Sequence, residues 1–120
     1  MKLLEIANTD GKVVRETVSQ IIKSSIRGSK ARWQFDKFGL DLGLQYLGDD
    51  LQEAKKVIDD IVSRLLKKFQ GVKISKRTLP GGIKQKVFEI SPGIEFFHLE
   101  NPGTNSRVSD FGFLVKKIKR

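Results

Sequence analysis

The sequence contains no cysteine, so it can form neither a disulfide framework nor a thiolate metal site or nucleophile. It has one histidine, His98, and no helical pattern pairs the histidines or carboxylates that a metal site needs. No apolar run reaches the ~18–20 residues that span a bilayer, and the first residues show no signal-peptide cleavage site. We therefore expect no metal, no cofactor and no membrane contact.

Acidic residues are also scarce: 14 stand against 23 basic residues, which gives a formal net charge of +9. A charge of this size bears on partners rather than on fold. The excess is concentrated after Phe69, in Lys73–Lys86 and in the tail residues Lys116, Lys117, Lys119 and Arg120. Such patches attract either nucleic acid or an acidic protein surface.

The segment from Leu51 to Phe69 is the clearest element. Its apolar residues recur every three or four positions and form one stripe wide enough to face a core. Asp50 is a suitable N-cap, with Glu53 placed to return a capping-box bond. Gly71 follows as a stop. These features predict the main helix, 51–69, with Asp59 and Asp60 on its solvated face.

The preceding residues predict a first strand at Lys2–Ala7 and a second helix at 13–27, where Gly28 suits the left-handed residue after a helix. Ala31, Trp33 and Phe35 alternate with polar residues, which indicates a short extended segment. The residues from Leu40 to Leu47 have no clean period, and their glycines favour a compact loop or a short helix.

After Phe69 the pattern changes to strands. Leu79-Pro80-Gly81-Gly82 is a strong turn signal between two strands, and Ile94–Leu99 and Phe111–Ile118 predict two more. Residues 72–120 are thus expected to form antiparallel strands. The whole chain, 1–120, reads as a single α+β domain with two main helices packed on a small, mainly antiparallel sheet with C-terminal hairpins.

The search for catalytic residues finds no convincing arrangement. His98 lies in a strand pattern, where a lone histidine is most often a satisfied or solvated ring. Gly39–Gly43 lacks the Lys-Ser/Thr of a phosphate loop, and Asp110-Phe111-Gly112 resembles a kinase triplet only by coincidence. We therefore expect no catalytic or metal-binding residues and predict that the protein is not an enzyme.

A nucleic-acid-binding protein is the alternative. Two helices followed by a basic hairpin is the order of a winged-helix domain, whose wing contacts phosphates. The candidate contacts on the hairpin are Lys73, Lys76, Arg77, Lys84 and Lys86. Trp33 and Phe35 beside Lys30, Arg32 and Lys37 also offer an aromatic and basic cluster typical of single-strand binding, although packing explains it better.

A family resemblance adds a third line of argument. Gly28-Ser29 after the first helix, Phe38-Gly39-Leu40-Asp41-Leu42, an amphipathic helix and a hairpin occur here in that order. This arrangement resembles the baseplate wedge protein of contractile phage tails, the tail-sheath initiator, which also occurs in type VI secretion baseplates. The resemblance covers roughly 10–90 and centres on Gly28, Ser29, Phe38, Gly39 and Leu42. Where that family has a Glu-Pro-Arg-like step, this chain has Lys68-Phe69-Gln70-Gly71-Val72.

The resemblance implies a non-enzymatic assembly protein of the virion tail baseplate, assembled in the host cytoplasm as part of a hetero-oligomer. Its partners would be tail sheath and baseplate wedge proteins, bound by strand addition at a free sheet edge. We expect the basic hairpin and the C-terminal strand to carry these contacts. The candidate residues are Lys73, Lys76, Arg77, Lys84, Lys86, Phe111, Phe113, Val115, Lys116, Lys117 and Lys119.

Overall fold

The main helix, α3, runs from Leu51 to Lys68 in the computed structural model, which describes residues 11–104 and 107–116. Asp50 caps it as expected, because its carboxylate accepts from the backbone N–H groups of Gln52 and Glu53 at 3.1 and 3.2 Å. The predicted capping-box bond is replaced by a tertiary one, since the Glu53 carboxylate accepts from the Ser29 hydroxyl at 2.9 Å. The buried stripe is Ala54, Val57, Ile58, Ile61 and Leu65.

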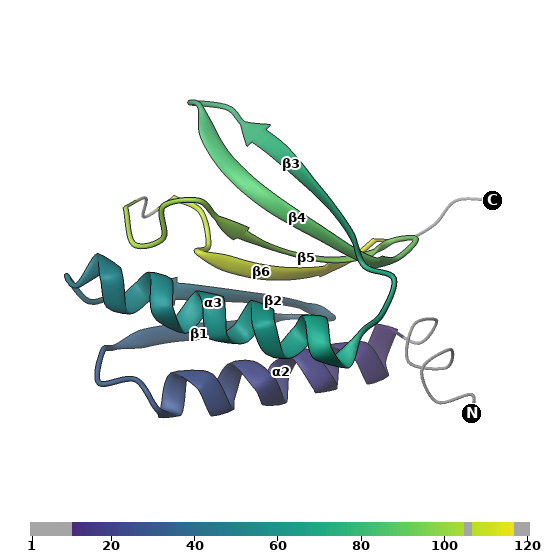
Figure 1. Cartoon of the computed structure of the whole chain (residues 1–120), viewed down its shortest axis with the longest axis horizontal. Helices are drawn as coiled ribbons and strands as arrows, with labels where there is room; N and C mark the ends of the chain where they lie inside the picture. Colours follow the sequence, from purple (N-terminus) through teal and green to yellow (C-terminus); the bar gives the residue numbers. More distant parts are fainter. Residues whose placement is uncertain (1–10, 105–106, 117–120) are drawn as a thin grey trace.

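The second helix, α2, spans Gly11–Arg27 and packs beside α3 (Figure 1). Its buried face includes Val14, Val18 and Ile22. Ser25 donates to Asp60 of α3 at 2.9 Å, so Asp60, whose side chain is 46% exposed on the predicted solvated face, also contacts the neighbouring helix. Gly28 does not adopt the expected positive φ; the turn closes through the Ser29 N–H, which donates to the Ile26 carbonyl at 3.1 Å.

Among the described residues, six strands form one antiparallel sheet in the order β1-β2-β6-β5-β4-β3, and helices α2 and α3 lie on one of its faces (Figure 1). The strands are β1 (Trp33–Phe38), β2 (Asp41–Tyr46), β3 (Lys73–Leu79), β4 (Ile83–Ser91), β5 (Ile94–Leu99) and β6 (Phe111–Val115). This architecture confirms the α+β prediction. The strand predicted at Lys2–Ala7 lies outside the described residues.

The expectation of a loop or short helix at Leu40–Leu47 is wrong, because Asp41–Tyr46 is strand β2. Gly39, with a φ of +62°, makes the tight turn that pairs β2 with β1. Leu42, Leu44 and Tyr46 then alternate on the helix side of the sheet and are almost fully buried. In the sequence, Gly43 obscures this alternation because glycine is rare inside strands. In the structure Gly43 lies within β2, directly opposite Gly112 of β6.

The core lies between the helices and the face of the sheet that they cover, which we call the helix-side face. Phe88, Phe96, Phe111 and Phe113 fill its centre and are at most 1% exposed. The rings of Phe88 and Phe96 stack with centroids 4.6 Å apart. Large rings on three adjacent strands thus supply most of the apolar volume that the helices cover.

On the opposite face, which we call the outer face, Phe97 lies across Gly112 of the neighbouring strand. A Cβ added to Gly112 would overlap the Phe97 ring. The guanidinium of Arg77 covers this ring at 5.7 Å from its centroid, and Phe97 is only 9% exposed. Gly112 therefore makes room for an aromatic side chain that shields the outer face.

Replacing this glycine should cost stability. We expect Gly112→Ala to lower the free energy of unfolding by about 1–3 kcal/mol, because Phe97 must leave its place under Arg77. Urea denaturation measures the loss, and Phe97→Ala in the same chain should recover part of it. Gly43→Ala is the matched control, since its Cβ would come within 2.9 Å of the Ser109 hydroxyl, which can rotate away, and would otherwise make contacts of 3.5 Å or more. Equal losses at the two glycines would contradict the Phe97 explanation.

Candidate functional site

Strand β3 ends the sheet on one side, since its only partner strand in the described part of the chain is β4. An antiparallel strand uses both of its sides for hydrogen bonding, so one side of the β3 backbone is open to a further strand. In Figure 1 the β3–β4 hairpin extends away from the helices. The free edge is therefore exposed along Lys73–Leu79.

A groove of about 520 Å³ lies between α3 and this hairpin. Its apolar part is made by Val62 and Leu66 of α3, Ile74 of β3 and Phe88 of β4. The polar residues at its margin are Asp59, Ser63, Lys67, Lys86 and His98. We call it the α3–hairpin groove.

Two apolar side chains of the groove remain open to solvent. Ile74 is 54% exposed and Leu66 is 37% exposed, whereas Phe88 beneath them is only 1% exposed. The reason is geometric: Ile74 lies on the edge strand β3, whereas Phe88 lies opposite it on β4, one strand further into the sheet. A partner that covered Ile74 and Leu66 would gain hydrophobic free energy that the isolated chain leaves unused.

The groove also has a basic margin. The Lys86 ammonium lies 5.7 Å from the centroid of the Phe88 ring. The His98 ring stacks on the same Phe88 ring, with the two centroids 5.7 Å apart. The His98 Nδ1 donates to the carbonyl of Leu99 at 2.9 Å, since a carbonyl can only accept. Lys67 adds a second ammonium from α3. Asp59 at the same margin offsets one of the two ammonium charges, and the remaining positive charge favours an acidic, partly apolar ligand.

The five cations predicted on the hairpin do not form one patch. The register places Lys76, Lys84 and Lys86 on the helix-side face with Ile74, whereas Lys73 and Arg77 lie on the outer face. Lys76 is 3.9 Å from Glu100 across a solvent-exposed gap. Three of the five predicted residues thus share the face of the groove.

Arg77 has a structural role instead. Its Nε donates to Gln85 at 2.9 Å and its Nη2 lies 3.1 Å from Glu95, whose other oxygen is 3.2 Å from the Lys116 ammonium. Glu95 is 9% exposed, so these contacts compensate a largely buried carboxylate. Arg77 and Lys116 are therefore occupied within the chain rather than offered to a partner.

The C-terminal strand does not provide the predicted docking edge. Strand β6 lies between β2 and β5, and both of its sides are paired. Phe111 and Phe113 are fully buried, and the Val115 N–H donates to Asp41 at 3.0 Å. The expectation was wrong because apolar alternation describes a central strand as well as an edge. Lys117 and Lys119 lie outside the described residues.

The motif residues mostly shape the fold. Ser29 links the loop before β1 to α3, because its hydroxyl donates to Glu53 and accepts from the Trp33 indole at 3.2 Å. Gly39 makes the β1–β2 turn and Leu42 is 2% exposed. Phe38, beside Gly39, is 62% exposed.

Asp110 is a buried residue that the sequence reading dismissed as part of a chance triplet. One carboxylate oxygen accepts from the Tyr46 N–H and the other from the Gly103 N–H, both at 2.7 Å. Its own N–H donates to the Leu44 carbonyl at 2.9 Å. Asp110 thus fastens the loop between β5 and β6 to strand β2, and no ligand is needed to explain its burial.

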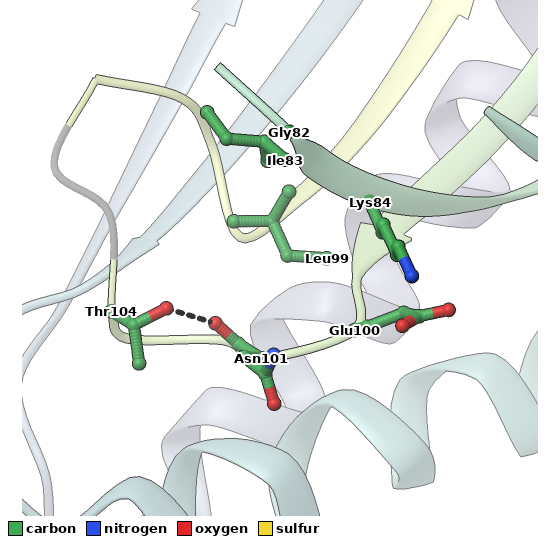
Figure 2. Close-up of a pocket in the computed structure, with 7 residues that line it drawn as sticks. All are labelled: Gly82, Ile83, Lys84, Leu99, Glu100, Asn101 and Thr104. Carbon is green, nitrogen blue, oxygen red and sulfur yellow. Dashed lines mark hydrogen bonds between the residues drawn. The ribbon is translucent and has the colours of Figure 1, made fainter. Parts of the chain in front are cut away.

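A second hollow, of about 350 Å³, lies between the β3–β4 turn and the loop after β5. Figure 2 shows Lys84 and Glu100 at one end and Asn101 and Thr104 at the other, with the Thr104 hydroxyl bonded to the Asn101 carbonyl at 2.6 Å. These polar side chains all belong to exposed residues. Its apolar lining, Ile83 and Leu99, is less exposed than Ile74 and Leu66 of the α3–hairpin groove.

Among the described residues, no group of histidine, aspartate and glutamate side chains is placed to hold a metal ion. Over the same residues, no helix has the length and apolar character to cross a bilayer. The sequence also gave no direct sign of the groove, since Val62 and Leu66 read as ordinary core positions. Ile74 stands out from the other apolar residues only when two facts are combined: its side chain lies on the helix-side face of β3, and β3 is an edge strand.

The fold and the groove define a class: an α+β protein that presents a basic, unpaired sheet edge beside an apolar groove. No family model, curated protein or solved structure matches this chain.

Proposed function

We propose that this protein is a non-enzymatic docking module that binds a neighbouring protein by strand addition at β3, with the added strand's side chains in the α3–hairpin groove. The exposed Ile74 beside the open edge of β3 carries the proposal. Lysines alone are a common means of preventing edge pairing. An edge that is only protected does not need an apolar side chain exposed next to an apolar groove.

The groove defines the chemistry of the partner. A strand alternates its side chains, so every second residue of an added strand faces the helix side. Apolar residues there would contact Ile74 and Leu66, and acidic residues would meet Lys86 in the groove and Lys76 on the same face of β3. Electrostatic complementarity of this kind sets register and association rate more than affinity.

The resemblance to the tail-sheath initiator family suggests the larger assembly. We place the module in the baseplate of a contractile tail or a related injection machine, bound to sheath and wedge proteins. Strand addition is the interaction expected of that family, and the free edge of β3 provides a position for it.

Nucleic acid remains the alternative. The hairpin carries Lys73, Lys76, Lys84 and Lys86, but these four side chains are divided between two faces of the sheet. One phosphate backbone would meet only part of them. A tight gel shift at ~150 mM salt that disappears when the four lysines are changed to glutamate would favour this alternative over docking.

The decisive experiment compares two exposed apolar residues. Ile74 is 54% exposed in the groove, and Leu47, directly after strand β2 and away from the groove, is 49% exposed. We expect Ile74→Glu to weaken binding to the neighbouring protein that docks at β3 at least tenfold, because a carboxylate would replace an apolar contact. Leu47→Glu should bind like the wild type in the same titration.

The two levels of the proposal fail separately. Docking at β3 is wrong if Ile74→Glu binds the partner as tightly as the wild type does. The contractile-tail assignment is wrong if the partner that depends on Ile74 is neither a sheath nor a wedge protein.

A further inference from the structure

Two buried polar groups on α2 have no hydrogen-bond partner within the described part of the chain. They are the Ser19 hydroxyl and the Nε of Arg15. Ser19 is 1% exposed, and the Arg15 side chain is 18% exposed. A buried donor without a partner costs free energy, so such groups indicate a ligand or bound water that completes them.

Further cations gather at the same place. Arg15, Ser19 and Lys23 are spaced four residues apart, so they follow one side of α2. Lys37 of β1 pairs with Leu42 of β2, whose side chain is in the core, so Lys37 lies on the helix-side face of the sheet, where α2 packs. The charge of the Lys23 ammonium lowers the pKa of Lys37 most, and partial desolvation and the charge of Arg15 lower it further. Like charges this close repel one another, and the packing of the hydrophobic core does not require these side chains to be close together.

One carboxylate offsets part of this charge. Glu16 pairs with the Nη1 of Arg15 at 2.7 Å and acts on Lys37 in the opposite direction to the cations. Three cations against one carboxylate leave an excess of two positive charges. Arg15 keeps its Nε unoccupied despite this pair, because Glu16 contacts only the end of the guanidinium.

We propose that Arg15, Ser19, Lys23 and Lys37 form a binding site for a phosphomonoester between α2 and the edge strand β1. The site supplies a hydroxyl, a guanidinium N–H and two ammonium groups. A phosphomonoester carries a charge of about −1.5 to −2 at neutral pH and three acceptor oxygens, which match this excess and these donors. A carboxylate has half that charge and two oxygens.

Bound water is the other way to complete the site. A water molecule would satisfy the Ser19 hydroxyl but would leave the repulsion between Lys23 and Lys37 in place. An anion removes both costs at once. The site is independent of the β3 edge, because β1 and β3 lie at opposite ends of the sheet.

The test uses inorganic phosphate and phosphoserine as monoester dianions, with chloride at matched ionic strength as the reference. Both are titrated into the full chain, followed by melting temperature and by amide chemical shifts. We expect saturable binding, a higher melting temperature and shifts centred on α2 and β1. A short oligonucleotide, which offers phosphodiester monoanions, should bind at least tenfold more weakly.

Lys37→Gln separates binding from folding. It removes one repelling charge, so without phosphate it should melt no lower than the wild type, yet the phosphate-dependent rise should disappear. Ser19→Ala should reduce the rise as well. Lys55→Gln, an exposed cation on α3, is the matched control and should keep the full response. An equal phosphate response in the wild type and in Lys37→Gln would overturn the proposal, as would stronger binding of the oligonucleotide.

Discussion

Ile61→Asp should abolish the cooperative fold. Ile61 is fully buried in the stripe of α3, between the helices and the sheet. The substitution removes a large apolar side chain, which alone costs about 2–5 kcal/mol, and places an unpaired carboxylate in the core. Because a domain of this size is stable by only about 5–15 kcal/mol, the loss is comparable with its whole stability.

Circular dichroism and urea denaturation measure this loss, and Ser63→Asp is the control. Ser63 is two residues further along α3 on the exposed side, so the same carboxylate remains in water there. We expect the control to change stability by less than about 0.5 kcal/mol. Two variants that unfold alike would show that the assigned buried face of α3 is wrong.

Asp60 illustrates how tertiary contacts modify a face read from the sequence. The helical period correctly places it away from the buried stripe, but the period says nothing about the position of α2. In the structure Asp60 accepts from Ser25 and pairs with Arg64 at 3.2 Å, and Arg64 donates to Ser24 at 3.1 Å. A mutation such as Asp60→Ala therefore breaks a link between helices as well as a surface ion pair.

The helices and the β3–β4 hairpin could be predicted because their signals are local. The stripe and cap of α3 and the Pro80-Gly81-Gly82 turn each lie within a few residues. The order of the strands could not be predicted in this way. Strand β6 pairs with β2 and β5, and its pairing with β2 joins residues about 70 positions apart.

The same limit applies to the candidate sites. Lys73–Lys86 was visible as a basic segment, but which of its side chains share a face with Ile74 depends on the register with β4. Arg15, Lys23 and Lys37 were visible only as scattered cations. Their proximity depends on how α2 packs against the sheet, and no pattern in the sequence reports this.

Asp110→Ala should be the most destabilising change to a polar side chain. It leaves the N–H groups of Tyr46 and Gly103 without their acceptor and frees the loop between β5 and β6 from β2. We expect a loss of about 2–4 kcal/mol, since each orphaned buried donor costs about 1–3 kcal/mol and removal of the buried charge offsets part of it. Chemical denaturation measures this loss. Asp36→Ala, on the edge strand β1, is the control and should have little effect.

The pH dependence distinguishes Asp110 from an ordinary loop contact. Burial raises the pKa of Asp110 above the ordinary value of 3.8, against the opposing hydrogen bonds from Gly103 and Tyr46. A carboxyl whose pKa is raised by folding binds more protons in the native state, so its contribution to stability falls as the pH rises above 3.8 through the raised value. The wild type should therefore lose stability relative to Asp110→Asn over that range, because the amide does not titrate. If the stability of the wild type minus that of Asp110→Asn stayed constant or increased with pH, the two N–H donors rather than burial would control the pKa of this carboxylate.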